Sequence, residues 1–249
     1  MLHIFADPGD VEGEVLRITG LEYNHIRNVL RLKPGEEISA SIGGDGKEYR
    51  YGIETYEDEA VICRLRFVRE SDVELPVKVY LFQGLPKSDK MDFIVQKAVE
   101  LGAAAIIPVR MERCVMKLDA AKAARKTERW QAIAQSAASQ SRRSIIPEVM
   151  MPMTMKEAVA FAAEKTDVRL IPYELQEDDG SAKRYLEGIR GNGRAVSVFI
   201  GPEGGFTPEE IALARSAGIR PISLGRRILR TETAGLTVLS WLIYILEIE

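Results

Sequence analysis

The N-terminal part of the chain consists of short runs in which apolar and polar positions alternate or β-branched residues gather, the pattern of half-buried β-strands. Runs of this kind are expected to form strands at 15–19, 37–42, 49–55 and 60–66. Glycines at 43, 44 and 46 indicate a hairpin turn, and one short helix is expected at 22–30. A polar segment that ends at Pro76 follows, so residues 1–72 are predicted to form a small β-rich domain.

Beyond residue 72 the pattern changes to apolar runs of strand length that alternate with stretches of helix length. Strands are expected at 77–82, 104–109, 168–172, 195–200 and 221–224, and helices at 88–101, 119–140 and 182–189. This alternation predicts a mostly parallel sheet flanked by helices, an α/β domain over residues 73–249. The last helix, expected at 234–246, is apolar nearly all round and must be covered on every side, by its own domain or by a symmetric partner.

Two glycine-punctuated loops each follow a predicted strand and lead into a helix. Residues 200–206 read Ile-Gly-Pro-Glu-Gly-Gly-Phe, and residues 224–234 read Leu-Gly-Arg-Arg-Ile-Leu-Arg-Thr-Glu-Thr-Ala. Because Gly204 and Gly205 have no Cβ, they can take positive φ and bring backbone N–H and C=O groups against a ligand. Small ligands bind at the ends of strands in α/β sheets, so the two loops predict a small-molecule site.

The helix after the first loop has a clear start signal, whereas the loop itself has no phosphate motif. Thr207 is expected to be the N-cap, with Pro208 at the first helical position and Glu210 completing a capping box. The sequence has neither a Gly-Lys-Ser/Thr loop nor a Gly-x-Gly-x-x-Gly fingerprint with a ribose-binding acid. Glu203 is a poor neighbour for a pyrophosphate, so the loop favours a neutral or cationic ligand.

The charge of the chain is nearly balanced overall but unevenly distributed. There are 34 Lys and Arg against 37 Asp and Glu, a net charge of −3, which by itself argues against a nucleic-acid-binding protein. Residues 110–143, however, hold nine Lys or Arg and three Asp or Glu. A basic stripe is expected on the predicted helix 119–140, with Trp130 on a different face; it is formed by Lys122, Arg125, Lys126 and Arg129. Such a stripe is either a solvated surface or a contact for an RNA backbone.

Several classes of site are excluded by composition. Two cysteines and two histidines are too few for a metal cluster or a disulfide framework, so neither is expected. The longest uncharged stretch, 233–246, is shorter than the ~20 residues that a membrane span needs. Without a secretory leader at its start, the chain is expected to be a cytoplasmic protein with no membrane segment.

The two glycine loops together resemble those of the 16S ribosomal RNA uridine-N3 methyltransferase family, within the SPOUT superfamily of S-adenosylmethionine-dependent RNA methyltransferases. The resemblance continues in the same order through 25–31 (His-Ile-Arg-Asn-Val-Leu-Arg), 90–102 (Lys-Met-Asp to Glu-Leu-Gly), 112–117 (Glu-Arg-Cys to Lys) and Arg129-Trp130. It implies a SPOUT-type α/β methyltransferase domain whose C-terminal segment forms a trefoil knot that binds the cofactor. It also implies that residues 1–72 form a PUA-like β-barrel domain that binds RNA.

The same resemblance implies that S-adenosylmethionine is the cofactor and that N3 of uridine 1498 in 16S rRNA is the target. The implied cofactor-binding residues are Tyr173, Glu174, Ile200, Gly201, Pro202, Glu203, Gly204, Gly205, Leu224, Gly225, Ile228, Leu229, Arg230, Thr231 and Thr233. Arg230 is the candidate for stabilising negative charge on the uracil, because a guanidinium offers a planar fork of donors; a salt bridge to Glu232 that shapes the loop is the alternative. Glu232 is a candidate to receive the N3 proton or, as we favour, a structural residue that caps the last helix.

The residues expected to contact RNA share a cationic or amide side chain. They are Arg27, Arg31, Lys90, Arg113, Lys117, Gln140, Arg142 and Arg143. The chain departs from the family pattern at two positions, since Ser139 stands where the family has glutamate and His3 stands where it has arginine. These departures bear on RNA contacts, while the cofactor loops match.

The last expectations concern partners and alternatives. The resemblance and the apolar helix at 234–246 predict a homodimer, and the acidic chain favours an assembled 30S subunit over naked rRNA as substrate. A SPOUT methyltransferase for tRNA or 23S rRNA and a non-catalytic RNA-binding protein with a vestigial pocket are the alternatives. The match at 90–102 argues against the first alternative, and the intact loops argue against the second.

Overall fold

The chain folds into two compact units. The structure is a computed structural model that describes residues 1–176, 180–189 and 195–248. Unit 1 comprises Met1–Glu74 and Ala138–Ile146, and unit 2 comprises Leu75–Ala137 and Pro147–Glu249. The expected boundary between residues 72 and 73 lies two residues before Glu74, but Ala138–Ile146, expected in the second domain, packs with unit 1.

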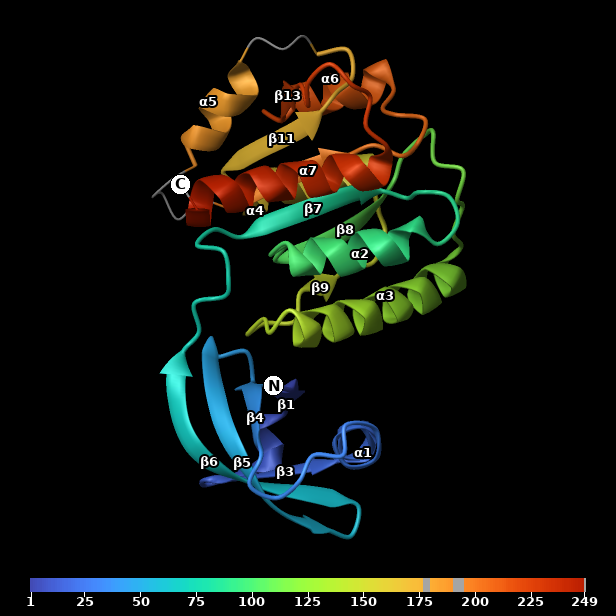
Figure 1. Ribbon diagram of the computed structural model, residues 1–249. Coiled ribbons are helices and arrows are strands. Elements are labelled where there is room, and N and C mark those ends of the chain that lie inside the picture. The colour runs from blue at the N-terminus through green and yellow to red at the C-terminus, as the bar shows by residue number, and fades with distance from the viewer. Residues whose placement is uncertain (177–179, 190–194, 249) are drawn as a thin grey trace. The chain divides into compact units, whose positions relative to one another are not determined.

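Unit 1 is a six-stranded, largely antiparallel sheet. Its strands are β1 (His3–Ala6), β2 (Val11–Glu12), β3 (Val15–Thr19), β4 (Glu37–Ile42), β5 (Lys47–Glu57) and β6 (Ala60–Glu70). Their order is β1-β4-β5-β6-β3-β2, and β1 runs parallel to β4. The sheet is strongly curved (Figure 1), but within unit 1 the outer strands β1 and β2 do not pair, so backbone pairing does not close the expected barrel into a ring.

The helical segment expected at 22–30 lies against this sheet. It forms as α1 (Gly20–Asn24) followed by a π-helical turn, His25–Val29, and a 3₁₀ turn at Pro8–Asp10 precedes β2. Ile26 points from this segment into a core that includes Leu16, Ile38 and Tyr51. The alternation of strand residues therefore buries one face of the sheet, as the sequence pattern predicts.

A buried polar cluster in unit 1 joins β1, β4 and the segment Ala138–Ile146. His3 Nδ1 lies 2.9 Å from Ser39 Oγ, and His3 Nε2 lies 3.0 Å from the carbonyl oxygen of Arg143. Burial lowers the pKa of His3 and the bond to the Arg143 carbonyl only partly offsets this effect, so the ring is neutral at pH 7. His3, at a position where the family has arginine, is thus an internal residue and not part of an RNA-binding surface.

Arg143 is a second internal member of this cluster. Its guanidinium pairs with the Glu74 carboxylate, which also accepts the Ser144 N–H at 3.0 Å, and only 5% of the Arg143 side chain is exposed. The prediction that Arg143 contacts RNA is therefore wrong, because its charge is used inside unit 1. A buried ion pair of this kind must stay paired, since removing one partner would leave an uncompensated charge.

Unit 2 is built on a parallel sheet of seven strands. Its strands are β7 (Val79–Gly84), β8 (Ala105–Arg110), β9 (Glu148–Val149), β10 (Met153–Thr154), β11 (Val168–Pro172), β12 (Val196–Ile200) and β13 (Arg220–Ile222). The order is β10-β8-β7-β12-β11-β13, with β9 also paired to β8, and every pair is parallel. The central strands are almost entirely buried, and Phe82 of β7 stacks on Phe199 of β12 with ring centroids 4.3 Å apart.

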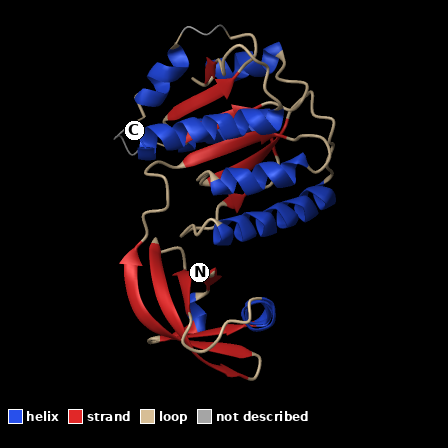
Figure 2. Ribbon diagram, in the orientation of Figure 1, coloured by secondary structure: helices blue, strands red, loops and turns tan. Residues whose placement is uncertain are grey.

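Helices cover both faces of this sheet (Figure 2). They are α2 (Lys90–Glu100), α3 (Ala120–Gln140), α4 (Met155–Lys165), α5 (Ser181–Glu187), α6 (Pro208–Ser216) and α7 (Thr231–Ile243), the last extended by a π-helical turn, Tyr244–Ile248. Within unit 2, α2 packs beside α7, and α4 packs beside α6. The α/β reading of this part of the chain is confirmed, although α4, β9 and β10 were not expected.

The apolar helix α7 is only partly covered by its own chain. Val238, Leu239 and Leu242 are buried, whereas Tyr244 and Ile248 are exposed. The 18 residues from Thr231 to Ile248 have a mean hydropathy of 1.2, so by length and composition this stretch could cross a membrane. Because Thr231 is hydrogen-bonded to the loop after β12 and α7 packs on α2 and β12, we interpret it as a helix of the α/β domain.

Candidate functional site

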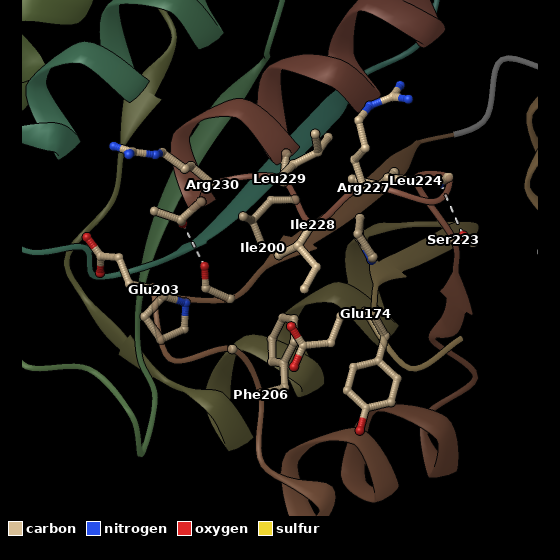
Figure 3. Close-up of a pocket in the computed structure, with 18 of the residues that line it drawn as sticks. Glu174, Ile200, Glu203, Phe206, Ser223, Leu224, Arg227, Ile228, Leu229 and Arg230 are labelled. Carbon is tan, nitrogen blue, oxygen red and sulfur yellow. Dashed lines mark hydrogen bonds between the residues drawn. The ribbon is translucent and has the colours of Figure 1, made fainter. Parts of the chain in front are cut away.

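The two glycine loops meet at the carboxyl edge of the parallel sheet. β12, β11 and β13 are neighbours in the sheet, so their ends at Ile200, Pro172 and Ile222 lie along one edge. The loops that follow enclose a cavity of about 420 Å³ (Figure 3). Ligands bind at this edge in α/β proteins, and the cavity is large enough for a small organic molecule.

The cavity brings together nearly all residues that the sequence assigned to a cofactor. Thirteen of them line it: Tyr173, Glu174, Ile200, Gly201, Pro202, Glu203, Gly205, Leu224, Gly225, Ile228, Leu229, Arg230 and Thr231. Gly204 and Thr233 do not line it. Residues that the sequence reasoning missed, or assigned elsewhere, also line it: Lys90, Pro172, Phe206, Ser223, Arg226, Arg227 and Ala234. Most of these are direct chain neighbours of the predicted residues, so taking each loop as a whole could have found them.

The two adjacent glycines of the first loop are needed for different reasons. Gly205 has φ of 68°, a left-handed conformation that favours glycine. Gly204 does not have positive φ; instead, a Cβ there would lie 3.0 Å from the Cβ of Arg113, whose guanidinium donates to the Gly204 carbonyl at 2.9 Å. The loop after β8 is thus packed directly against the glycine loop.

The predicted start of α6 is confirmed and fixes the far end of the first loop. Thr207 Oγ1 accepts the Glu210 N–H at 3.2 Å, and Glu210 accepts the Thr207 N–H at 2.9 Å. Glu210 is buried and uses its second carboxylate oxygen to accept the Glu112 N–H at 2.9 Å. The capping box therefore also anchors the loop after β8.

The second loop carries side chains that point in opposite directions. Gly225 has φ of 96°, and its N–H donates to Ser223 Oγ at 3.1 Å. Figure 3 shows the side chain of Ile228 extending into the space between the loops, while Arg227 extends away from it. Ile228 is 84% exposed, which is unusual for an isoleucine and leaves an apolar surface free for a ligand.

A neutral hydrogen-bond chain joins the two loops at their base. Thr231 Oγ1 donates to the Gly201 carbonyl at 2.6 Å, and the buried Gln83 Nε2 donates to Thr231 Oγ1 at 2.8 Å. Gln83 comes from β7, Gly201 follows β12, and Thr231 begins α7. The start of α7 is therefore fixed to the sheet, which holds the residues just before it in place.

A charged cluster joins α2 to the loop after β12 and to the first turn of α7. Lys90, the first residue of α2, places its Nζ 3.1 Å from Glu203 Oε1 and 3.1 Å from Glu232 Oε2. Glu203 also accepts the Lys87 N–H at 3.2 Å. The Lys90 side chain, predicted to contact RNA, is thus paired with two carboxylates, while 32% of it is exposed.

The cluster fixes the protonation state of its members. Burial by itself would raise the pKa of Glu203 and of Glu232, but hydrogen bonds from their own backbone N–H groups and from Lys90 together lower both pKa values. Hydrogen bonds to Glu232 and Glu203 raise the pKa of Lys90. All three groups are therefore charged at pH 7, and Glu232 is a weaker base than an ordinary glutamate.

Arg230 lies next to this cluster but is not part of its ion pairs. It is exposed, it directly precedes α7, and among the residues that the structure describes it has no ion-pair partner. The alternative in which Arg230 is used in a salt bridge to Glu232 is therefore not what the structure shows. Lys90 holds that carboxylate instead.

The other residues expected to contact RNA are mostly exposed. Lys117, Gln140 and Arg142 are exposed, and Arg113 is exposed while bonded to Gly204. In the basic stripe of α3, Arg129 pairs with Asp92 and Lys126 lies over the Trp130 ring at 5.9 Å. Arg125 has no described ion-pair partner among residues 1–176, 180–189 and 195–248.

In unit 1, Arg27 is held between two tyrosines. Its guanidinium lies 5.6 Å from the centroid of the Tyr23 ring and 5.3 Å from that of the Tyr56 ring. Arg31, in a left-handed conformation with φ of 55°, is exposed nearby in the chain. A guanidinium stacked on aromatic rings is preorganised, and such a surface suits nucleic acid.

The residues that the structure describes contain no candidate metal-binding site. In those residues no three His, Cys, Asp or Glu side chains gather as metal ligands. Cys63 and Cys114 are both buried and free, and burial raises the pKa of the Cys63 thiol to about 12. Neither thiol is suited to act as a nucleophile.

Comparisons with known proteins find relatives of both units. An RNA methyltransferase domain family matches residues 73–243, and an RNA methyltransferase PUA domain family matches residues 18–65. A Bacillus subtilis protein named ribosomal RNA small subunit methyltransferase E is 37% identical over 95% of this chain and 93% of its own length. An Aquifex aeolicus protein of the same name is 30% identical over 96% of this chain and 98% of its own. The crystal structure of a ribosomal RNA small subunit methyltransferase E from Neisseria gonorrhoeae bound to S-adenosyl methionine is 31% identical, with a TM-score of 0.84 over 98% of both chains.

Proposed function

The chain belongs to the family of ribosomal RNA small subunit methyltransferases E, and from this premise we propose that it methylates N3 of uridine 1498 in 16S rRNA, using S-adenosylmethionine. The observation that carries the proposal is the cavity at the sheet edge, where thirteen residues expected to bind the cofactor converge. Because the family match covers both units, the RNA-binding and the methyl-transferring parts are both present.

The cavity suits S-adenosylmethionine in chemistry as well as in size. Ile200, Phe206 and Leu224 offer apolar surface for a purine ring, and the carboxylate of Glu174 is an acceptor for a cationic group of the cofactor. When bound, the cofactor supplies an electrophilic methyl group on a positively charged sulfur. Gly204 and Thr233 act as supporting residues beside this pocket. We also assign to the C-terminal segment the trefoil knot of SPOUT enzymes, an assignment that rests on the resemblance of the two glycine loops to those of that superfamily.

Arg230 is the residue that stabilises charge on the target base. Methyl transfer to N3 requires loss of the N3 proton, so negative charge develops on the uracil oxygens, and an unpaired guanidinium donates to such oxygens. The proton leaves to solvent. Glu232 is a structural residue in this scheme, because its pairing with Lys90 lowers its proton affinity.

RNA is held by surfaces on each unit. In unit 1 these are Arg27, Arg31, Gln140 and Arg142, and in unit 2 they are Arg113, Lys117 and the exposed part of the α3 stripe. With a net charge of −3 the chain has few phosphate contacts to offer, which favours the assembled 30S subunit over naked rRNA as substrate. We infer that the protein acts in the cytoplasm and that neither a membrane nor a metal takes part in the reaction.

The uncovered apolar surface of α7 supports a homodimer. Trp241, Ile243 and Ile245 are only partly buried within the chain, and Tyr244 and Ile248 are exposed. A second copy that covers this helix would remove that apolar surface from water. Light scattering at micromolar concentration is expected to give the mass of two chains, and a monomer would contradict the proposal.

Methyl transfer from labelled S-adenosylmethionine to 30S subunits that lack the modification tests the function. Methylation at N3 blocks the pairing edge of uracil, so reverse transcription is expected to stop one nucleotide before uridine 1498. Label in tRNA or 23S rRNA alone would overturn the substrate but keep the chemistry. Cofactor binding without label in any RNA would favour the non-catalytic alternative, and equal rates on naked rRNA would remove the preference for 30S.

A further inference from the structure

Lys90 lies between two carboxylates that come from two different loops. Its Nζ is 3.1 Å from Glu203, in the loop after β12, and 3.1 Å from Glu232, in the first turn of α7. The exposed fractions of the three side chains are 32%, 27% and 19%, so the cluster is screened less than a surface ion pair. One lysine therefore balances two acids that are brought together only by the fold.

Arg230 is a possible competitor for the same carboxylate, because it is the N-cap residue of α7 and Glu232 lies in the first turn of that helix. It lies two residues before Glu232, and its charge acts on Glu232 electrostatically. Arginine is the better partner for a carboxylate, because its planar fork can bind both oxygens. Within the described residues, however, Glu232 pairs with Lys90 and Arg230 has no ion pair. In Figure 3 the side chains of Arg230 and Glu203 lie on the same side of the cavity, so Glu203 is a second acid within this neighbourhood.

We propose that Lys90 is a positioning residue, which occupies Glu232 and Glu203 and so keeps the Arg230 guanidinium free for the target uridine. Lys90 acts through Arg230 and does not itself touch the RNA. The proposal rests on the proposed function as far as the role of Arg230 is concerned. The competition between Lys90 and Arg230 for Glu232 is a property of the protein alone and can be measured without RNA.

A direct RNA contact by Lys90 predicts different behaviour. Loss of a phosphate contact raises the KM for RNA, leaves kcat unchanged and makes binding less sensitive to salt. If Lys90 is a positioning residue, its loss lowers kcat instead. Glu232 would then pair with Arg230 even when RNA is bound, and Arg230 could not donate to the uracil. The split between KM and kcat therefore separates the two roles.

The first test replaces Lys90 by methionine, which keeps the length of the side chain and removes its charge. K90M is expected to lower kcat about tenfold, the effect of about 1.4 kcal/mol on the barrier, with little change in the KM for RNA. K97M is the matched control, because Lys97 lies on the same helix, is 35% exposed and pairs with Glu100 at 2.7 Å. K97M is expected to keep kcat within about twofold, because Lys97 and Glu100 lie on the same helix and neither of them lines the cavity.

The second test removes the carboxylate that captures Arg230. In the double variant K90M/E232Q, kcat is expected to return to within about threefold of that of E232Q alone, since the two changes act on one interaction and are not additive. K90R, which keeps the charge, is expected to retain most of the activity. A double variant no more active than K90M, or an unchanged kcat in K90M, would overturn the proposal.

The third test does not depend on activity. A crystal structure of K90M without RNA is expected to show Arg230 paired with Glu232, whereas an Arg230 still unpaired would overturn the proposal. If the wild-type enzyme methylated no RNA, the proposed function would fail while this structural result would still decide the role of Lys90. Because Lys90 lines the cavity, calorimetry with S-adenosylmethionine is used to find the cofactor concentration that saturates K90M, and kcat is compared at that concentration.

Discussion

Replacing Arg230 by alanine is expected to lower the kcat of RNA methylation by about a hundredfold to a thousandfold, the size of effect seen when one donor to a developing negative charge is removed. The affinity for S-adenosylmethionine is expected to stay within about threefold of wild type. The start of α7 is expected to keep its place in this variant, because the hydrogen bonds of Thr231 to Gly201 (2.6 Å) and to Gln83 (2.8 Å) do not involve the Arg230 side chain. The loss therefore falls on the chemical step and not on the shape of the pocket.

Single-turnover methylation at saturating RNA and calorimetry with the cofactor measure the two effects separately. Arg227→Ala is the matched control: Arg227 lies in the same loop, lines the same cavity and is also exposed, but its side chain extends to another side of the loop than Arg230 (Figure 3). At saturating cofactor its kcat is expected to change by no more than about threefold, because the Arg227 side chain extends away from the space between the loops. If Arg230→Ala turned over as fast as wild type, Arg230 would have no part in the mechanism.

The local features of the site could be predicted from the sequence because they depend on neighbours in the chain. The strands at 37–42 and 168–172 coincide with β4 and β11, since alternating or continuous apolar runs determine which face is buried. Thr207 and Glu210 form the capping box that their spacing predicts. The start of α4 has the same signal, Thr154 and Glu157, and could have been predicted on that ground. β1 was not predicted because its four residues are too few to show a periodic pattern. Each of them pairs with a residue of β4 that lies 36 positions further along the chain.

The partners of charged side chains could not be predicted, because they come from distant parts of the chain. Lys90 and Glu232 are 142 positions apart, and Arg143 and Glu74 are 69 apart. A lysine or arginine in a basic segment favours RNA contact by its charge alone, but a fold that brings an acid beside it gives it an internal role. The prediction for Arg143 failed in this way. The position of the two glycine loops depends less on distant partners, because Gly205 and Gly225 have positive φ, which the residue type itself indicates.

The backbone of β7 closely approaches the backbone of the first glycine loop. Gly84 ends β7, and a Cβ at this position would lie 2.7 Å from the backbone nitrogen of Pro202 and 2.8 Å from its Cδ. Neither atom can move aside on its own, because the Pro202 nitrogen is bonded to the carbonyl group of Gly201. The oxygen of that carbonyl accepts a hydrogen bond from the Thr231 hydroxyl. Only a residue without a Cβ at position 84 allows Pro202, which lines the pocket, to lie this close to β7.

Gly84→Ala is accordingly expected to weaken S-adenosylmethionine binding by about tenfold to a hundredfold, since overpacking of this kind costs about 1–3 kcal/mol. Gly235→Ala is the matched control within the same unit. Its Cβ would meet Ile200 and Leu81 at 3.5 Å, an ordinary contact, and alanine stabilises a helix interior by about 1 kcal/mol relative to glycine. We expect G235A to raise Tm and to bind the cofactor as wild type does, whereas G84A lowers both Tm and affinity. Calorimetry and thermal unfolding measure both quantities, and wild-type affinity in G84A would mean that the approach of β7 to Pro202 does not determine the position of the cofactor loop.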